Sequence, residues 1–520
     1  MNVAASRSEL QDLVEIARAI TQERNIDRLL DLILEKSRFI TGADAGSIYV
    51  IESDDAGNKR LRFKLTQNDS CKFEASEYTL PLSYSSIAGA AVLRREAINI
   101  EDVYNIQHAD ITFDRSFDER VGYRTRSMLA VPLISAEREV LGVVQLINKK
   151  RDRATCLTTP KDVDQHVVAF DEHSEQILTT LAAQAGIALE NALLYTDIQN
   201  LFAGFVRASV QAIEQRDPTT SGHSLRVSVL CRGLAQVVDQ TRSGPFSDAT
   251  FNEKQLQELE YAALLHDFGK IGVREEVLVK AKKLYPYELD LVHARILTML
   301  QQYRAEFLDA KLSLAERHAP ASEFALLEQQ YADRCHELRD AWEFIHRANE
   351  PSILQQGDFS RIVDISRMVY QDDQGQVLPL LTPPQIKALQ VTKGSLTPEE
   401  LEEIRQHVVH TYQFLSKIPW GKAFEAIPQI ASAHHERLNG TGYPYGLVEA
   451  EIPLASKIMA VADIYDALTA ADRPYKKALD RNRALEILDA EAQAQHVDGQ
   501  LVRLFRDAEV YRQLDAPLHY

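Results

Sequence analysis

Two short runs place titratable residues where helices should be buried, and they constrain the fold more than any other feature. YAALLHDFGK, residues 261–270, begins as a buried helix and carries His266 and Asp267 at its end, with Gly269 as a natural stop. IMAVADIYDALTA, residues 458–470, is apolar on nearly all sides of a helix, which places Asp463 in the interior. Buried carboxylates and imidazoles are costly unless paired, so each run needs a metal ion or a hydrogen-bonding partner.

Further histidines occur in similar helix-like settings, at His223, His407 and the pair His434-His435. Together these residues offer imidazole and carboxylate ligands but no thiolate, a mixture that suits iron, manganese, nickel or zinc in an open hydrolytic site. An adjacent pair such as His266-Asp267 can serve two metal ions, with the carboxylate as the bridge. From residue types and spacing alone, a metal site and hydrogen-bonded structural pairs both remain open.

The first half of the chain alternates helix and strand patterns. Residues 8–41 are amphipathic and predict a helix, whereas short β-branched runs at 45–52, 61–67, 127–135 and 139–148 predict strands. The N-terminal half is therefore expected to combine helices with a sheet.

A long helix is expected from about residue 175 to 206. Its apolar residues recur three or four apart, as in the seam of a coiled coil. They are Leu178, Leu181, Ala185, Ala188, Ala192, Tyr195, Ile198, Phe202 and Phe205. An ordinary helix that packs on its own domain would show the same spacing. We favour a dimeric connecting helix, because it joins two domains without a Gly- or Pro-rich linker.

Beyond residue 206 the pattern is almost entirely helical. Residues 288–316 and 322–347 predict two long antiparallel helices joined near Pro320, and residues 366–381 predict a small hairpin around Asp372-Asp373-Gln374-Gly375. No chemical motif lies in this segment, so a packing or dimerisation role is the simplest expectation.

The formal net charge of −18 disfavours a nucleic-acid polymer as a partner, because such binding relies on Lys and Arg, yet it permits a small anionic ligand in a local pocket. The four cysteines are scattered, which argues against a disulfide framework or a Cys-type zinc site. No basic-then-apolar signal pattern opens the chain, and no run approaches about 18 uninterrupted apolar residues. We therefore expect a cytoplasmic protein without a membrane span.

Several motifs of the second half resemble the HD-GYP family. They are HxxR at 223–226, HDxGK at 266–270, HHExxNGTGYPxGL at 434–447 and IMAVADIYDALTAADRPYK at 458–476. The resemblance covers roughly residues 206–280 and 396–490. It implies an all-helical HD fold that hydrolyses cyclic di-GMP to the linear dinucleotide pGpG, and in some members onward to GMP.

By motif position, the resemblance implies two divalent metal ions, iron or manganese, and a defined set of ligands. The implied metal ligands are His223, His266, Asp267, His407, His434, His435 and Asp463. Asp267 would act in catalysis as the bridging ligand, and Lys270 would act with it by contacting a substrate phosphate. The Gly442-Tyr443-Pro444 turn would line the substrate pocket, and Arg473 would bind a second phosphate.

Three departures from the family pattern bear on these expectations. Some members bind a third metal ion through a Glu four residues before the first ligand histidine; this chain has Thr219 there, so we expect two ions. About 110 extra residues follow the His-Asp pair and form an insertion of unassigned role at 283–395. Arg473 lies one residue further from Asp463 than is usual in the family, because of Ala470-Ala471.

The first half resembles a GAF domain. The segments that carry this resemblance are SIAG at 86–89, RSMLAVPL at 126–133, EVLGVVQLINKK at 139–150 and FDEHSEQILTTLAAQAGIALENALLY at 170–195. Asn148, Lys149 and Phe170-Asp171-Glu172 echo the NK…F…DE signature of GAF domains that bind cyclic nucleotides, which implies such a ligand. The alternative is structural, with Phe170 in the core and the acidic pair at a helix N-terminus.

These inferences predict an α+β GAF domain, an antiparallel sheet with helices, at 8–175. A connecting helix at 176–205 would join it to an all-α HD-GYP domain at 206–520 that carries a helical-hairpin insertion. We expect a homodimer that hydrolyses cyclic di-GMP under control of the GAF domain. Two alternatives stay open: a non-catalytic protein that binds cyclic di-GMP, and a phosphohydrolase of the same fold that acts on another cyclic dinucleotide.

Overall fold

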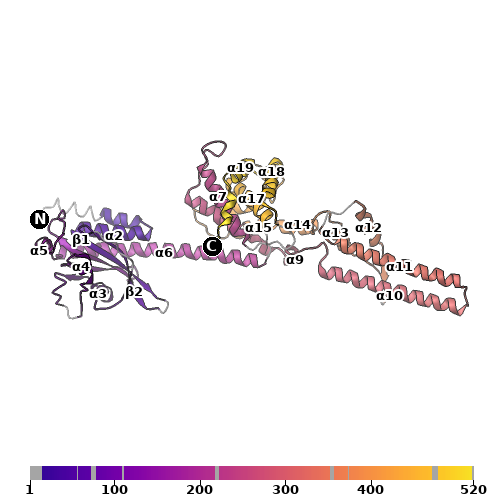
Figure 1. Ribbon diagram of the computed structural model, residues 1–520, viewed down its shortest axis with the longest axis horizontal. Coiled ribbons are helices and arrows are strands. Elements are labelled where there is room, and N and C mark those ends of the chain that lie inside the picture. The colour runs from indigo at the N-terminus through magenta and orange to yellow at the C-terminus, as the bar shows by residue number, and fades with distance from the viewer. Residues whose placement is uncertain are drawn as a thin grey trace. The chain divides into compact units, whose positions relative to one another are not determined.

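The structure is a computed structural model that describes residues 14–54, 57–71, 78–107, 110–216, 222–351, 356–372, 374–470 and 478–517. The chain divides into two compact units, Met1–Ala203 and Gly204–Tyr520. The first unit is a sheet covered by helices and the second is built almost entirely of helices (Figure 1).

An antiparallel sheet with the strand order β3-β2-β1-β6-β5-β4 forms the centre of the first unit, and β7 pairs with β6. The strands are β1 (Ala43–Ser53), β2 (Lys59–Asn68), β3 (Thr79–Pro81), β4 (Ile98–Ile100), β5 (Met128–Ile134), β6 (Val140–Lys150) and β7 (Val167–Val168). The four predicted strands are confirmed as β1, β2, β5 and β6. The sequence pattern missed β3, β4 and β7, because two or three residues are too few to show a period.

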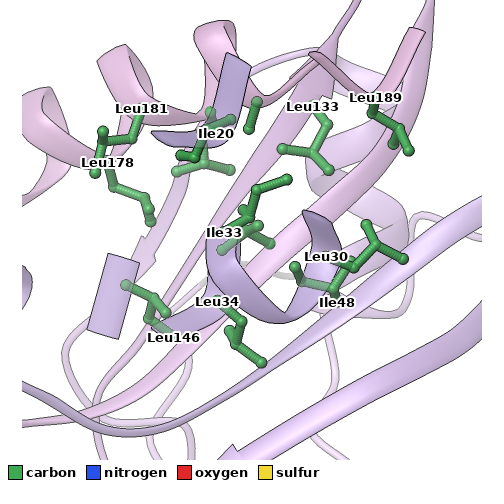
Figure 2. Close-up of a cluster of buried hydrophobic side chains, with 14 of the residues drawn as sticks. Ile20, Leu30, Ile33, Leu34, Ile48, Leu133, Leu146, Leu178, Leu181 and Leu189 are labelled. Carbon is green, nitrogen blue, oxygen red and sulfur yellow. The ribbon is translucent and has the colours of Figure 1, made fainter. Parts of the chain in front are cut away.

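Both faces of the sheet are covered by apolar side chains. On one face, α2 (Ile26–Thr41) and the first part of α6 (Glu172–Arg216) pack against β1, β5 and β6. Figure 2 labels members of this cluster: Ile20, Leu30, Ile33, Leu34, Ile48, Leu133, Leu146, Leu178, Leu181 and Leu189. On the other face, α3 (Ile87–Arg94) packs on the alternate residues of the same strands. The short helices α4 (Ser116–Val121) and α5 (Pro160–His166) lie in the connections.

The prediction of a single helix at 8–41 is wrong. Residues 14–22 are helical, the helix ends there, and α2 begins at Ile26. Asn25 explains the interruption, because its side-chain oxygen accepts a hydrogen bond from the N–H of Arg28 at 3.0 Å and so caps a new helix. Residues 8–13 lie outside the described residues.

The first part of the expected coiled-coil seam belongs to the core of the sheet domain. Leu178, Leu181, Ala185, Ala188 and Ala192 are all buried in the cluster with β1, β5 and β6. Ordinary packing on the same domain therefore explains the spacing of these residues, and a partner helix cannot contact them. Dimerisation itself stays a prediction.

Among the described residues, α6 is the one helix whose length and apolar composition would suffice to cross a membrane. Half of its most apolar 18-residue window is buried inside the protein. Core helices of soluble proteins meet the same criterion, so the expected lack of a membrane span also stays a prediction.

The second unit is a helical assembly. Its helices outside the insertion are α7 (His223–Gln240), α8 (Glu253–Leu265), η2 (Phe268–Gly272), α9 (Glu275–Leu278), α14 (Pro398–Arg405), α15 (His407–Leu415), α16 (Ile427–Ser432), α17 (Leu454–Thr469), α18 (Arg481–Gln493), α19 (Gly499–Asp507) and η3 (Val510–Asp515). α7 packs on α8 and α17, α15 packs on η2 and α16, and α16 also contacts α8. These contacts gather the ends of several helices around one point.

The insertion contains the predicted helical hairpin, formed by α10 (Pro286–Glu316) and α11 (Ala321–Ala348) (Figure 1). The elements at its base are α12 (Gln356–Ser366), β8 (Val369–Gln371), β9 (Val377–Pro379) and α13 (Pro383–Leu389). β8 and β9 confirm the predicted small hairpin, of which Asp373 lies outside the described residues. The helices of the insertion share an apolar core of their own.

A substitution at Gly186 of α6 tests how closely this helix packs on the sheet. A Cβ at Gly186 would lie 2.1 Å from the carbonyl oxygen of Ile134, whereas a Cβ at Gly204 of the same helix would have no atom within 4 Å. We expect Gly186→Ala to destabilise the sheet domain by about 1–3 kcal/mol through overpacking. Gly204→Ala should instead stabilise the helix by about 1 kcal/mol. Thermal unfolding of the full-length variants by circular dichroism measures both; equal shifts would contradict the close packing.

Candidate metal centre

The seven predicted ligands come from separate helices of the second unit and meet in its interior. Their positions are His223 at the start of α7, His266 and Asp267 directly after α8, His407 at the start of α15, His434 and His435 directly after α16, and Asp463 within α17. The structure therefore brings together residues that are up to 240 positions apart in the sequence.

Asp267 lies between the imidazoles. Its Oδ2 atom is 3.6 Å from His266 Nε2 and 3.8 Å from His223 Nε2, and its Oδ1 atom is 3.3 Å from His407 Nε2. Asp463 Oδ1 lies 3.2 Å from His223 Nε2. Two groups of side chains each have ligand atoms within 4.8 Å of one another: His223, His266 and Asp267, and His407, His434 and His435. Asp267 thus directs one carboxylate oxygen toward each group.

Three of the imidazoles are oriented in the same way. The Nδ1 atoms of His266, His407 and His434 lie 2.7, 2.6 and 2.6 Å from the backbone carbonyl oxygen three residues earlier. A carbonyl oxygen only accepts hydrogen bonds, so Nδ1 carries the proton and Nε2 keeps a lone pair.

All three Nε2 atoms are buried and have no hydrogen-bond partner among the residues that the structure describes. A buried polar atom without a partner costs about 1–3 kcal/mol. Hydrogen-bonded structural pairs would leave no such atoms, whereas metal ions would use them as ligands, with the carbonyl contacts holding each ring in place. The residues therefore fit divalent metal ions.

The electrostatic environment keeps three of the histidines and Asp267 in the forms that bind a metal ion. Burial lowers the pKa of His407 and His434, and it lowers the pKa of His435 to about 4, so these imidazoles are neutral at neutral pH. Burial alone would raise the pKa of Asp267, but Lys270 and the neighbouring histidines hold it well below its usual value. Neutral imidazoles beside ionised carboxylates are the donor set that divalent metals require.

Asp466 is a buried residue of this centre that the sequence analysis missed. Its Oδ2 atom lies 2.7 Å from His223 Nδ1, and its Oδ1 atom accepts a hydrogen bond from Arg226 Nε at 2.6 Å. Burial alone would lower the pKa of His223, but hydrogen bonds to Asp463 and Asp466 raise it to about 9. A carboxylate on the far nitrogen of a metal-binding histidine orients the ring. The signal was available, since Asp466 lies one helical turn after Asp463.

The turn that carries His266 and Asp267 is fastened to α15. Thr411 Oγ1 donates a hydrogen bond to the carbonyl oxygen of His266 at 3.0 Å and accepts one from the N–H of Gly269 at 2.8 Å. A Cβ at Gly269 would lie 1.8 Å from the carbonyl oxygen of His407, so only glycine permits this approach. The two metal-ligand segments are thus held against each other through backbone atoms.

Only a few side chains of the centre are exposed to solvent. The side chains of His223, His266 and His407 are at most 5% exposed, whereas His435 is 28% exposed and Lys270 is 15% exposed. Lys270 Nζ lies 2.9 Å from Asp267 Oδ2. The exposed part of the centre therefore carries an ammonium group and an imidazole.

The Gly442-Tyr443-Pro444 turn lies next to this opening. The ring of Tyr443 is 4.8 Å from that of His435 between centroids, and the guanidinium of Arg405 lies 5.3 Å from the Tyr443 ring centre. Buried Glu436, which the sequence analysis also missed, accepts hydrogen bonds from the N–H groups of Tyr445 and Leu447 and fixes the loop. An aromatic ring and a cation thus flank the opening.

Two residues that the resemblance implied, Thr219 and Arg473, lie outside the described residues. The expectation of two rather than three metal ions, and the phosphate contact of Arg473, stay predictions.

In the sheet domain, Lys149 and Asp171 of the cyclic-nucleotide signature contact each other. Lys149 Nζ forms an ion pair with Asp171 Oδ1 at 2.8 Å and donates a hydrogen bond to Ser174 Oγ at 2.7 Å. Phe170 is buried in the core, and Asp171 accepts a hydrogen bond from the N–H of Ser174 near the start of α6. These contacts agree with the structural alternative, and a ligand of this domain stays a prediction.

Comparisons with known families confirm the domain types that the motifs suggested. Residues 25–189 match the GAF domain model, and residues 220–341 and 380–501 match HD domain models. The GAF domain of a phosphoenolpyruvate-protein phosphotransferase from Acinetobacter aligns with 36% of this chain and 98% of that chain, at 20% identity and a TM-score of 0.27.

Two curated relatives are phosphodiesterases. A segment of 96 residues is 41% identical to 3'3'-cGAMP-specific phosphodiesterase 3 of Vibrio cholerae, covering 18% of this chain and 20% of that protein. A segment of 190 residues is 30% identical to the cGMP-specific 3',5'-cyclic phosphodiesterase of Drosophila virilis, covering 35% of this chain and 19% of that protein. The chain thus spans a fifth or less of the length of these relatives.

Asp466 should control metal affinity without contacting the metal. We expect Asp466→Ala to weaken the binding of Mn(II) by about 10–100-fold, because His223 loses the group that orients it, and Asp466→Asn to have a smaller effect because it keeps an acceptor. Asp515→Ala, which removes a half-exposed carboxylate paired with Arg481, is the matched control. Calorimetric titration of the metal-depleted proteins measures the affinities. Unchanged affinity in a folded Asp466→Ala protein would contradict this role.

Proposed function

Because the chain joins a GAF domain to an HD domain, we propose that it is a metal-dependent phosphodiesterase that hydrolyses a cyclic dinucleotide, cyclic di-GMP. The observation that carries the proposal is the set of buried Nε2 atoms of His266, His407 and His434, which have no hydrogen-bond partner in the described part of the chain and lie beside two ionised aspartates. The names of the phosphodiesterase relatives support the same class of reaction.

We assign the metal ligands as the resemblance implied them. The ligands are His223, His266, Asp267, His407, His434, His435 and Asp463. Divalent ions bound there would lower the pKa of a water molecule and stabilise negative charge on a phosphoryl oxygen. Asp267 would bridge the two ions, because its two oxygens face different histidine groups.

The reaction adds a water oxygen to phosphorus while the bond from phosphorus to the 3' oxygen breaks, and the departing 3' oxygen takes up a proton. Hydrolysis of one such bond in cyclic di-GMP gives pGpG. Lys270 would donate hydrogen bonds to a phosphoryl oxygen whose negative charge grows in the transition state. Tyr443 would hold the nucleotide at the opening through its ring, and Arg405 adds positive charge beside it.

A second candidate substrate is 3'3'-cGAMP. The 41% identity to a 3'3'-cGAMP-specific enzyme over 96 residues favours it, and the two dinucleotides differ in only one base. The phosphodiester chemistry is the same for both, so the metal centre does not distinguish them. The bases must be distinguished around the opening near Tyr443.

We also propose that the GAF domain regulates hydrolysis through α6. This helix begins in the sheet domain and runs without interruption to Arg216 in the helical unit. A ligand or partner of the GAF domain that shifts this helix would alter the start of the catalytic domain. The identity of such a ligand is left open by the contacts of Lys149 and Asp171.

The decisive experiment is a metal-reconstitution assay. The full-length protein is purified without oxygen, its metals are measured, and it is stripped with a chelator. We expect hydrolysis of cyclic di-GMP to vanish on stripping and to return with Fe(II) or Mn(II). The same assay with 3'3'-cGAMP ranks the two substrates by kcat/KM. Metal binding with nucleotide affinity but no turnover would favour a non-catalytic binding protein.

Asp267→Asn separates metal-dependent hydrolysis from other activity. The substitution keeps the side chain's shape but removes the charge that faces both histidine groups, so we expect loss of metal and a fall in kcat of at least about 10³-fold. Asp507→Asn, at an exposed position at the end of α19, should leave both unchanged. Activity that survives Asp267→Asn would contradict the proposed mechanism.

Lys270→Met tests the phosphate contact. This variant retains the aliphatic stem but not the ammonium group, and Lys270 is not among the proposed metal ligands. We expect kcat to fall by about 10²–10³-fold because one donor to the transition state is lost. The metal content should stay near that of the wild-type protein, which metal analysis of the purified variant verifies. A loss of metal equal to that of Asp267→Asn would show a structural role instead.

A further inference from the structure

The last residue of α6 binds the backbone that follows Lys270. Arg216 donates a hydrogen bond from Nη1 to the carbonyl oxygen of Ile271 at 2.9 Å and one from Nη2 to the carbonyl oxygen of Val273 at 3.0 Å. The last carbonyls of a helix have no partner within it, and Ile271 belongs to the end of η2. Arg216 therefore caps the helical turn that carries Lys270.

The shape of the guanidinium group gives this cap a direction. Its two terminal nitrogens are fixed in one plane, so bonds to carbonyls two residues apart set both the position and the orientation of the backbone. The Nε atom of Arg216 is buried and has no hydrogen-bond partner among the described residues. Both hydrogen bonds that the structure gives this side chain therefore go to one stretch of backbone, residues 269–274, which we call the Lys270 segment.

The Lys270 segment is also held by α14 and α15. A Cβ at Gly272 would lie 2.5 Å from His410 Nδ1, so the backbone packs directly on α15 at this point. Arg274 forms an ion pair with Glu403 of α14, with 2.7 Å between Nη2 and Oε2. The segment is therefore held by three helices, and the contact that α6 contributes is the guanidinium of its last residue.

We infer that Arg216 is a positioning residue for Lys270 and the point at which the end of α6 acts on the metal centre. The inference rests on the proposed function, because Lys270 is the group that would meet the substrate phosphate. The ammonium of Lys270 lies 2.9 Å from Asp267 Oδ2, so a small shift of η2 changes where that ammonium is presented. A displacement of the helix end by about 1 Å would lengthen both bonds from Arg216 beyond hydrogen-bonding range. Arg216 thus acts through Lys270 rather than on the substrate.

The first test compares the kcat of full-length, metal-loaded Arg216→Met and Arg216→Lys with that of the wild-type protein. A misplacement of about 1 Å can lower a rate by about 10²-fold. We therefore expect the kcat of Arg216→Met to fall by about 10–100-fold, while KM and the metal content stay near the wild-type values. Arg216→Lys keeps the charge but not the fork of donors, so its kcat should lie between the two.

Arg481→Met is the matched control for this comparison. It removes a half-exposed guanidinium that pairs with Asp515, and its kcat should equal that of the wild-type protein. An unchanged kcat in a folded Arg216→Met protein would overturn the inference. Loss of the bound metal from Arg216→Met would also overturn it, because the substitution would then disrupt the centre as a whole rather than the placement of Lys270.

A double-mutant cycle tests whether Arg216 acts through Lys270. If it does, the protein that combines Arg216→Met with Lys270→Met should have the kcat of Lys270→Met alone, because the group that Arg216 positions is already absent. A general weakening of the fold would instead add its own loss to that of Lys270→Met. Losses that multiply in the double variant would therefore assign Arg216 a structural role and contradict the inference.

Amide hydrogen exchange separates this inference from the proposed function, because it needs no substrate. Within the segment, the N–H of Val273 donates to the carbonyl oxygen of Lys270 at 3.0 Å, and the N–H of Lys270 donates to that of Asp267 at 3.0 Å. Without its cap η2 should open more often, so we expect both amides to exchange about tenfold faster in full-length Arg216→Met and at the wild-type rate in Arg481→Met.

The two results together identify which statement fails. Unchanged exchange in Arg216→Met would overturn the inference even in a protein that hydrolyses cyclic di-GMP. Faster exchange in a protein that hydrolyses neither cyclic di-GMP nor 3'3'-cGAMP would support the hold of Arg216 on the Lys270 segment and contradict the proposed function.

Discussion

The helical unit depends on a cluster of imidazoles and carboxylates that it buries away from water. Such a cluster is unfavourable in an apolar interior, and the protein reduces the cost in two ways. Backbone carbonyls three residues earlier fix His266, His407 and His434, and paired charges surround Asp267 and Asp463. As far as the structure describes the chain, the Nε2 atoms of these three histidines have no hydrogen-bond partner. The metal ions that we propose would complete the interior of the fold as well as supply the chemistry.

This requirement explains why helices end or begin at the centre. A histidine directly after a helix lies close enough to a free carbonyl of the last turn to donate to it, since the last carbonyls of a helix have no partner within it. His266 and His434 use that position after α8 and α16. The arrangement also requires the backbone at Gly269 to lie close to the backbone at His407. The absence of a side chain at Gly269 permits this approach, and the hydrogen bond from Gly269 to Thr411 fixes it. The packing of the helices therefore also sets the positions of the proposed ligands.

The resemblance of motifs such as HDxGK to a known family singled out seven residues that the fold brings together, and their role as metal ligands stays a prediction. Asp466 and Glu436 lie within the same motif segments, but their roles were missed because they depend on partners that the fold supplies: His223 for Asp466 and the N–H groups of the following loop for Glu436. The four long strands could be predicted from their period, whereas the break at Asn25 could not, since the helices on both sides bury the same face.

The error in the coiled-coil seam has a physical cause that bears on the whole of α6. A helix that is apolar on two faces contains two rows of residues three and four apart, and the sequence does not show which row a neighbouring sheet covers. Here the sheet covers Leu178 and Leu181 and leaves Leu194 and Leu201 in solvent. The same double-sided composition makes the helix resemble a membrane span. Burial separates these interpretations for the first part of α6, because the sheet covers one face of the helix and leaves the other exposed.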